Sequence, residues 1–439
     1  MMKKKVFSVL FSLTVLASSV IGFAGCGGAG DGLEALPEYE DNKEMMIGGW
    51  DSPPNTLEDY QLAKDMGLTH IFIDEYFAPK GSQDYEEILG FCEEVGLKAI
   101  INMGASIDGE KPVDDTDYSV YPAVDMVNYW DEPTIGRLDI VREQAQEHEA
   151  LYEGKRDITF YVNLDPNGGG GDPEEYMTKY CEEIVPLISG RKILSTDVYP
   201  LLGRNGAYSV SSTWLPRLEL NATYAKQYGM EQHFFVQSYW STLTGTRELE
   251  SIEDLRFQFY VDMAYGVQNF SYFTYTHSFI EGFGGGCVDR ENSCKTTEIY
   301  DWAKQINAEL TAFDHVYLSF EWNGTMPIVG KDNPDGENAH FMALKSPLSS
   351  LTCANSVSSS QDSIIGQFKD ADGNDGLIVT NYTDPLDKID NIVSFDFKNA
   401  NRAIIYRGGE RKIYEVKDGK LDIRLSPGEG VFVIPVKLK

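Results

Sequence analysis

The chain has 439 residues and a net charge of −32, because 69 Asp and Glu outnumber 37 Lys and Arg. Nucleic acid phosphates and anionic membrane surfaces both require a basic face on their partner. We therefore expect no nucleic acid partner, and a membrane contact only through a lipid anchor.

The first residues predict an export signal rather than part of the fold. A basic start, Met1–Lys5, precedes an apolar run, Val6–Phe23, and the small residues before Cys26 complete the pattern of a secretory signal. The ending Ala-Gly-Cys resembles a bacterial lipobox, which implies that Cys26 is lipidated and holds the protein on the outer face of a bacterial membrane. A plain secreted protein is the alternative. We expect residues 1–26 to be the lipoprotein signal peptide and residues 27–43 to be a flexible tether.

From residue 44 onward, apolar strand-like runs alternate with helical spacing. Alternating strands and helices predict parallel pairing, and eight strands fit a closed (β/α)₈ TIM barrel, an α/β fold, over residues 44–315. An open doubly wound sheet would carry a Gly-rich phosphate loop after its first strand, and GGWDSPPN at 48–55 is not one. The expected strands lie within 45–50, 69–76, 97–104, 126–133, 158–166, 192–201, 233–240 and 268–277. The expected helices lie within 56–67, 83–96, 134–154, 173–189, 214–229, 251–266 and 296–313.

After residue 315 the pattern changes to short strand-like pieces separated by Gly, Asn and Asp. This pattern predicts a C-terminal antiparallel β-sandwich over residues 316–439, without helices. The clearest expected strands are 339–346, 375–382, 392–397, 402–408 and 430–436. Two local predictions accompany this division of the chain. Four glycines at 168–171 indicate a flexible loop, and Cys287 and Cys294 share a Gly-rich segment and could form a disulfide.

Candidate site residues follow from the barrel, because its active site lies at the carboxyl ends of the strands. Those ends carry acids, amides and aromatic rings within otherwise apolar runs. No grouping of ligands predicts a metal, and no motif predicts a cofactor. The candidates at the strand ends are Trp50, Asp74, Glu75, Asn102, Tyr129, Asp131, Glu132, Asn163, Asp197, Tyr199, Gln237, Tyr239, Trp240, Tyr275 and His277.

The fourth strand ends in Asp131-Glu132-Pro133. Two carboxylates that flank a bond are the equipment of glycoside hydrolysis. The motif resembles the Asn-Glu-Pro of the barrel glycoside hydrolases of clan A, in which the Glu is the acid/base. The adjacent Asp-Glu pair also resembles the substrate-assisted β-N-acetylhexosaminidases. The whole mature chain is similar to glycoside-hydrolase-like bacterial lipoproteins with the sequences YVNLDP, DVYP, FVQSYW and AYGVQNFSYFTY. These resemblances imply that Glu132 is a general acid and that Asp131 orients a substrate acetamido group.

The seventh strand departs from clan A, because Gln237 stands where those enzymes carry a nucleophilic Glu. Three explanations remain open. Asp197 could act as the nucleophile or as the base for water, the substrate acetamido group could attack, or the protein could bind sugar without cleaving it. A peptidase or esterase has no supporting motif.

Strand geometry separates the two acids of the fourth strand. Neighbouring residues point to opposite faces, so we expect Glu132 to lean over the barrel mouth and Asp131 to be held beneath it. Crowding by Trp130, Tyr129 and a second acid should raise the pKa of Glu132. The sequence therefore predicts a surface-anchored glycosidase acting on β-linked oligo- or polysaccharides, with a non-catalytic carbohydrate-binding lipoprotein as the alternative.

Overall fold

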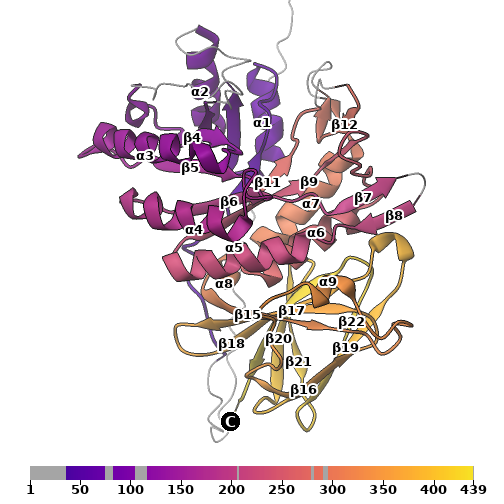
Figure 1. Ribbon diagram of the computed structural model, residues 1–439. Coiled ribbons are helices and arrows are strands. Elements are labelled where there is room, and N and C mark those ends of the chain that lie inside the picture. Colours follow the sequence, from indigo (N-terminus) through magenta and orange to yellow (C-terminus); the bar gives the residue numbers. More distant parts are fainter. Residues whose placement is uncertain are drawn as a thin grey trace, which may run out of the picture. The chain divides into compact units, whose positions relative to one another are not determined.

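The barrel predicted from the sequence is present in the computed structural model, which describes residues 36–74, 83–103, 116–204, 207–277, 281–289 and 295–438. Eight parallel strands close in the order β1-β11-β9-β6-β5-β4-β3-β2, and helices surround them (Figure 1). Six of these strands lie within the expected ranges, whereas the fourth and seventh strands along the chain begin two residues before theirs. Their bounds are β1 Ile47–Gly49, β2 His70–Asp74, β3 Lys98–Asn102, β4 Val124–Asp131, β5 Thr159–Leu164, β6 Ile193–Asp197, β9 Glu231–Gln237 and β11 Asn269–Phe273.

Seven of the helices lie within their predicted ranges, the short eighth helix follows the last of those ranges, and local signals explain where helices begin and end. Thr56 caps the first helix by accepting a hydrogen bond from the backbone N–H of Asp59, and Gly229 ends the fifth in the left-handed conformation. Between β3 and β4, the described chain contains only the short 3₁₀ helix η1 Tyr118–Val120. The bounds are α1 Leu57–Asp65, α2 Gln83–Val95, α3 Leu138–Tyr152, α4 Pro173–Glu183, α5 Trp214–Tyr228, α6 Ile252–Ala264, α7 Glu298–Thr311 and α8 Asp314–Tyr317.

Alternate residues of the barrel strands form a small apolar core inside the barrel. Large side chains fill its centre, so the barrel is a packed core rather than a pore. Trp50, Tyr199 and Phe273 pack against this core and are only partly buried. They mark the side on which the barrel interior opens. The core residues are Met46, Phe72, Ile100, Met126, Tyr161, Ile193 and Phe235.

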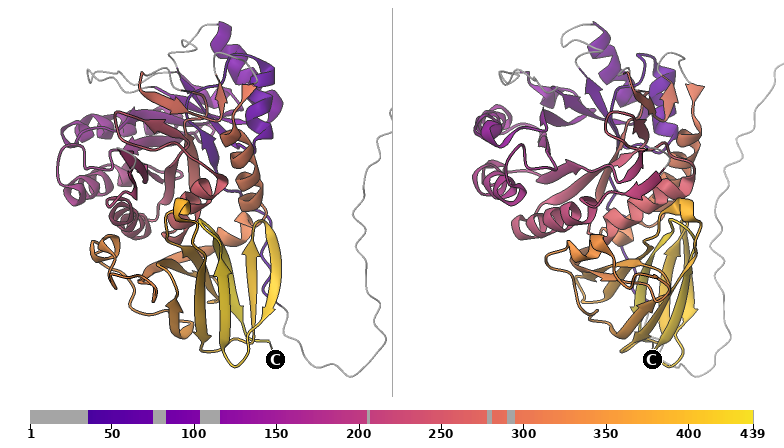
Figure 2. Two further views of the ribbon diagram at one scale, coloured as in Figure 1. Left: turned by 90° about the vertical axis from the view of Figure 1, so that its right-hand side faces the viewer. Right: turned by 45° about the vertical axis from the view of Figure 1, so that its right-hand side comes forward.

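The C-terminal part is the predicted antiparallel β-sandwich, and Figure 2 shows its strands from two further directions. A six-stranded sheet, β15-β17-β18-β23-β20-β21, accompanies a three-stranded sheet, β16-β19-β22. A core that includes Ile365, Val379, Phe395 and Val431 is buried here. The strands are β15 Phe320–Ile328, β16 Ala354–Ser359, β17 Ser363–Asp370, β18 Asp375–Asn381, β19 Asn391–Phe397, β20 Arg402–Arg407, β21 Glu410–Glu415, β22 Lys420–Leu425 and β23 Gly430–Val436.

Two expectations for this region are wrong. Residues 339–346 are not a strand but begin with the short helix α9 Ala339–Met342, which starts because the Asn338 side chain accepts a hydrogen bond from the backbone N–H of His340. The expectation that this region contains no helix is also wrong, because α9 lies in it and η4 Pro385–Asp387 adds a 3₁₀ turn.

Barrel and sandwich belong to one compact unit, Leu36–Leu438. Helix α6 meets β17 closely, since a Cβ added to Gly366 would lie 2.2 Å from the carbonyl oxygen of Ala264. The Thr325 hydroxyl donates to that same carbonyl at 2.8 Å, and the Tyr317 hydroxyl donates to the carbonyl of Val267 at 2.8 Å. The predicted boundary between residues 315 and 316 falls inside α8, and the domain boundaries stay predictions.

Several sequence predictions fall on residues outside the described ranges, namely the signal, Cys26, most of the tether, Glu75 and Cys294. Cys287 is a buried free thiol, as are Cys92 and Cys181. Within the ranges that the structure describes, none of the helices has the length and apolar character needed to cross a membrane.

The contact between α6 and β17 generates a stability prediction. Gly366→Ala should lower the melting temperature, because its Cβ would overlap backbone atoms of Ala264 and overpacking typically costs about 1–3 kcal/mol. Gly90→Ala is the matched control. Gly90 lies within α2, and no atom of the described residues comes within 4 Å of its added Cβ, so alanine should stabilise the helix by about 0.5–1 kcal/mol. Thermal denaturation of both variants tests the contact, and an unchanged melting temperature for Gly366→Ala would contradict it.

Candidate active site

A cavity of ≈ 410 Å³ opens at the carboxyl ends of the barrel strands. Its lining combines three acids, two amides, one Arg, several hydroxyls and a group of aromatic rings. Seven of the residues predicted from the sequence contribute to it, from β1 round to the segment after β9. These seven are Trp50, Asp131, Glu132, Asn163, Asp197, Tyr199 and Tyr239.

A β-bulge in β4 places the acids in this cavity. Asn128 pairs with Tyr161 of β5, and Asp131 pairs with Asn163, so β4 uses three residues where β5 uses two. The extra residue shifts the alternation of the strand by one position. Asp131 therefore faces the barrel interior, as Asn128 does, although the two are three residues apart. Glu132 has a positive φ of 52°, a backbone conformation uncommon for residues other than Gly. As predicted, Glu132 is exposed at the mouth and Asp131 is held by a hydrogen bond.

The Asn163 side chain joins the acids of two strands. Its Nδ2 donates to Asp131 Oδ1 at 3.0 Å and to Asp197 Oδ1 at 3.1 Å. Its Oδ1 accepts from the Ser195 hydroxyl at 2.9 Å, and this bond fixes which end of the amide faces the acids. Because both carboxylate oxygens contact one nitrogen, they are no more than about 6 Å apart.

The three acids share a site in which burial and like charges favour protonation. Burial, reinforced by the charge of Asp74, raises the pKa of Asp131 to about 6, although the bond from Asn163 lowers it. Burial and the charge of Asp131 raise the pKa of Asp197 to about 7, against hydrogen bonds from Asn163 and Tyr199. Desolvation at the cavity wall, followed by the charges of Asp197, Asp131 and Asp165, raises the pKa of Glu132 to about 8.

The raised pKa favours the protonated form of Glu132 near neutral pH. Within the described chain, its carboxyl makes no hydrogen bond, whereas its backbone N–H donates to the Asn163 carbonyl at 2.8 Å. The carboxyl is free to donate to a ligand. The sequence predicted a raised pKa for Glu132, with crowding by Tyr129 as one of its causes. Tyr129 does not line the cavity, so it is not part of the cause.

The loop with four glycines supports the segment that follows Glu132. A Cβ on Gly169, which has φ +60°, would lie 2.6 Å from the Ile135 nitrogen and 2.9 Å from the Pro133 carbonyl. The Gly169 carbonyl accepts from the Ile135 N–H at 3.0 Å, and the Tyr176 hydroxyl donates to the Pro133 carbonyl at 2.7 Å. The loop that was expected to be flexible thus makes close backbone contact with residues 133–135, which follow the acids of the fourth strand.

Gln237 does not line the cavity. Its side chain is fully buried, and its Nε2 donates to the carbonyls of Leu201, Tyr239 and Arg247 at 2.9–3.2 Å while its Oε1 accepts from the Leu201 N–H at 3.1 Å. An amide can supply these donors together with an acceptor, whereas an ionised Glu would have no donor for the three carbonyls. Gln237 is a structural residue, so its amide says nothing about whether the protein is catalytic.

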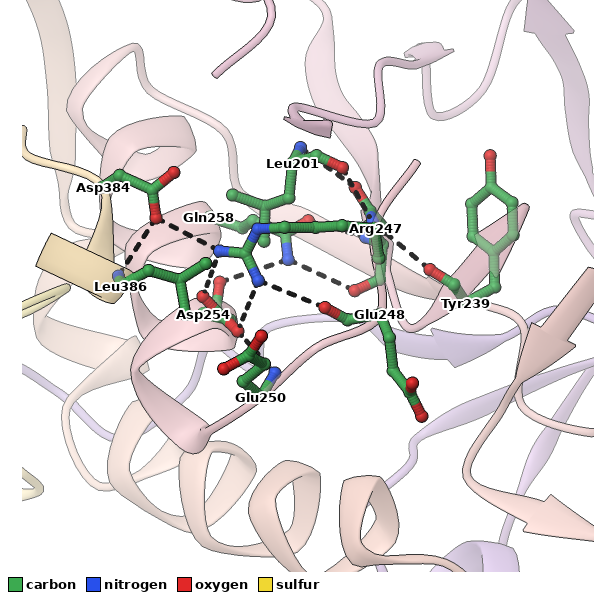
Figure 3. Close-up of polar contacts among 10 residues, drawn as sticks. Leu201, Tyr239, Arg247, Glu248, Glu250, Asp254, Gln258, Asp384 and Leu386 are labelled. Atoms are coloured by element: carbon green, nitrogen blue, oxygen red, sulfur yellow. Dashed lines mark hydrogen bonds and ion pairs between the residues drawn. The ribbon is translucent and has the colours of Figure 1, made fainter. Parts of the chain in front are cut away.

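The backbone carbonyl of Arg247 accepts one of these bonds from Gln237. Arg247 anchors the loop that brings Thr244 and Thr246 to the cavity. Figure 3 shows its guanidinium between Asp254 and Asp384. It donates to the two carboxylate oxygens of Asp254 at 2.9 and 2.6 Å and to Asp384 of the β-sandwich at 3.2 Å. This buried ion pair connects the sandwich to one wall of the site.

The remaining predicted residues lie outside the cavity lining. The Tyr129 hydroxyl bonds to His148 Nδ1 at 2.9 Å, because the alternation of the strand after Asn128 directs this ring outward against α3. The Trp240 ring packs where a Cβ on Gly284 would lie, and His277 lines a separate cavity. Tyr275 is buried. Asp74 and Asn102 bond to each other at 2.6 Å beside the site.

Sequence reasoning missed more than half of the lining. Phe235 and Phe273 lie within strands whose later residues were chosen, and strand alternation alone could have indicated them. The others come from loops, from the short strands β7 Leu201–Arg204 and β12 Phe283–Gly285, and from the start of α5, where no periodic signal exists. The missed residues are Pro166, Asn167, Val198, Leu202, Ser211, Thr213, Arg217, Phe235, Thr244, Thr246, Phe273 and Phe283.

Comparison with known proteins adds the fold relationship. A search with protein-family models finds no match to the sequence, and a search of curated proteins finds none. Solved structures with the same fold include a candidate α-galactosidase from Bacteroides fragilis, at 13% identity and a TM-score of 0.54, covering 90% of this chain and 80% of that one. A family 5 glycoside hydrolase from Bacteroides vulgatus matches at 12% identity and a TM-score of 0.52, covering 90% and 89%.

A family 27 β-L-arabinopyranosidase from Geobacillus stearothermophilus matches at 12% identity and a TM-score of 0.50, covering 90% of this chain and 96% of that one. These neighbours are glycoside hydrolases, and at such identities the likeness concerns the fold.

The raised pKa of Asp197 generates a prediction that needs no substrate. Asp197 has a folded-state pKa of about 7 against an ordinary value of 3.8, so the folded state binds the proton more tightly. Stability should fall as the pH rises through this interval, because folding then buries a charge. Asp197→Asn should therefore raise the melting temperature relative to the parent at pH 8 and change it little at pH 4. Melting curves across pH 4–8 test this, and a destabilised variant at pH 8 would contradict it.

Proposed function

We propose that this protein is a glycoside hydrolase that cleaves β-linked glycans, with Glu132 as the general acid. One observation carries the proposal. The Glu132 carboxyl reaches the cavity without a hydrogen bond to any residue that the structure describes, and its pKa is raised to about 8 beside two further acids. A general acid must be protonated at working pH and must reach the leaving oxygen, and Glu132 satisfies both requirements. The glycosidase fold of the neighbours supports the class, and the resemblance of the Asp-Glu-Pro motif supports the β-linkage.

The second carboxylate in this proposal is Asp197. It is close to Asp131 through Asn163 and receives hydrogen bonds from Asn163 and Tyr199, which favour its charged form. In this route Asp197 attacks the anomeric carbon or activates water, while Glu132 protonates the leaving group. In the substrate-assisted route, a 2-acetamido oxygen attacks instead and Asp131 holds the acetamido N–H. The adjacent acids of β4 favour the second route for acetamido sugars.

The test is a panel of chromogenic β-glycosides with and without a 2-acetamido group, on the soluble fragment from residue 32. Glu132→Gln should lower kcat on poorly activated substrates by about 10²–10⁴-fold, the usual contribution of a general acid. It should cost less on substrates with an acidic phenol, which leaves without a proton. Full activity of Glu132→Gln on all substrates sinks the assignment.

Matched variants separate the routes. If the acetamido route operates, a thiazoline analogue of the cyclised intermediate should inhibit, and Asp131→Asn should impair acetamido substrates selectively. If Asp197 is the reacting carboxylate, Asp197→Asn should abolish turnover of every substrate, and azide should restore it where a glycosyl-enzyme forms. Loss of activity in Asp131→Asn and Asp197→Asn with Glu132→Gln intact would make those two aspartates the catalytic pair. Binding of sugars without any turnover would favour the carbohydrate-binding alternative.

We also propose that the chain is exported and lipidated at Cys26, on the strength of the Ala-Gly-Cys sequence that follows the apolar run. Cys26→Ala should move the full-length protein from the membrane fraction to the soluble fraction in a bacterial host. The parent with its signal intact is the control. Membrane retention of Cys26→Ala would contradict lipidation at this residue.

A further inference from the structure

Arg217 is a cation beside the acids of the cavity. It belongs to the first turns of α5 and lines the cavity together with Ser211 and Thr213, which precede the helix. Among the lining residues that the structure describes, it is the sole basic side chain, against three acids. A basic residue here is unexpected in a chain with a charge of −32.

The guanidinium of Arg217 lacks a partner within the described ranges. Its Nε is buried without a hydrogen bond, and the side chain forms no ion pair there. A buried donor without a partner is costly, more so when it is charged, so folded proteins rarely leave one unsatisfied without a reason.

Nearby carboxylates do not remove this need. Asp165 and Asp172 are the charges that act most strongly on Arg217. Asp165 Oδ1 accepts from the Asn167 N–H at 2.6 Å, and Asp172 Oδ1 caps α4 by accepting from two backbone N–H groups at 3.0 and 3.1 Å. Both carboxylates therefore have structural roles in the loop and helix that follow β5, and the guanidinium remains open to a ligand.

We propose that Arg217 binds an anionic oxygen group on the substrate, a carboxylate or a sulfate ester, so that the cavity takes an acidic sugar. A guanidinium presents its donors as a planar fork that matches such groups, and a charge-assisted bond is about twice as strong as a neutral one. The hydroxyls of Ser211 and Thr213 also line the cavity and bond to each other at 3.0 Å, which leaves one hydroxyl proton for a ligand. The inference rests on the proposed glycosidase function and names the substrate class of the same cavity.

The experiment compares matched substrates that differ in one group. Aryl β-D-glucuronide and aryl β-D-glucoside test the carboxylate, and aryl β-D-galactoside with and without a 6-sulfate tests the sulfate. The parent should have a higher kcat/KM for the anionic member of one pair. Arg217→Gln should lower that kcat/KM by about 10–100-fold, the loss of a charged hydrogen bond, and change the neutral member by less than about threefold. Arg217→Lys should have a kcat/KM for the anionic substrate between those of the parent and Arg217→Gln, because lysine keeps the positive charge but lacks the planar pair of donors.

Arg142→Gln is the control for net charge, since Arg142 lies on α3 and pairs with Glu183 rather than lining the cavity. It should leave both members of each pair unchanged. Titration calorimetry with D-glucuronate, D-galacturonate and galactose 6-sulfate gives a readout that needs no turnover. Melting curves establish that Arg217→Gln is folded.

The outcomes separate this inference from the proposed function. Hydrolysis without a charge preference that depends on Arg217 overturns the inference and leaves the function standing. Binding of an anionic sugar that Arg217→Gln abolishes, without turnover of any glycoside, supports the inference and overturns the function. Absence of both binding and turnover overturns both.

Discussion

The candidate site depends on one side-chain amide that holds two like-charged groups close together. When both are ionised, two charges no more than about 6 Å apart repel by at least roughly 3 kcal/mol at an effective dielectric constant of 20, and Asn163 offsets this by donating to Asp131 and Asp197 at once. Its orientation is fixed by Ser195, whose hydroxyl contacts His233 at 2.9 Å. Burial lowers the pKa of His233 to about 3, so this ring is neutral. A chain of uncharged polar groups along the barrel interior thus orients the amide that keeps the acids in place.

The barrel could be predicted because the signal of each strand is local. A run such as ITFYVNLDP is apolar on both faces and ends in polar residues, as a buried parallel strand does. The sandwich was harder, because the edge strand Glu410–Glu415 is exposed along its whole length and carries no alternation of apolar residues. Residues 339–346 failed because four residues of helix are too short to show a helical period.

The site was predictable where a side chain belongs to a strand and not where it belongs to a loop. Asp131, Asn163 and Asp197 are strand residues, and the rule that active sites lie at the carboxyl ends of strands places them together. Arg217 and Thr246 reach the same cavity from a helix and a loop, whose positions depend on tertiary contacts. Gln237 and Tyr129 were misassigned because a sequence shows that a residue is at a strand end but not which neighbours its polar atoms meet.

The bulge in β4 has a consequence for how barrel sequences are compared. Ordinary alternation from Asn128 would direct Trp130 inward. The strand departs from this alternation, because Asn128 pairs with Tyr161 and the next paired residue is Asp131, which pairs with Asn163. A relative that lacks the extra residue would direct a different residue of the Tyr-Trp-Asp-Glu sequence into the cavity. A sequence alignment would show this difference only as a single gap in the fourth strand. Assigning an acid in this group of folds by counting along the fourth strand therefore requires knowing whether the strand is bulged, and a single inserted or deleted codon at this place would exchange an acid for an aromatic ring.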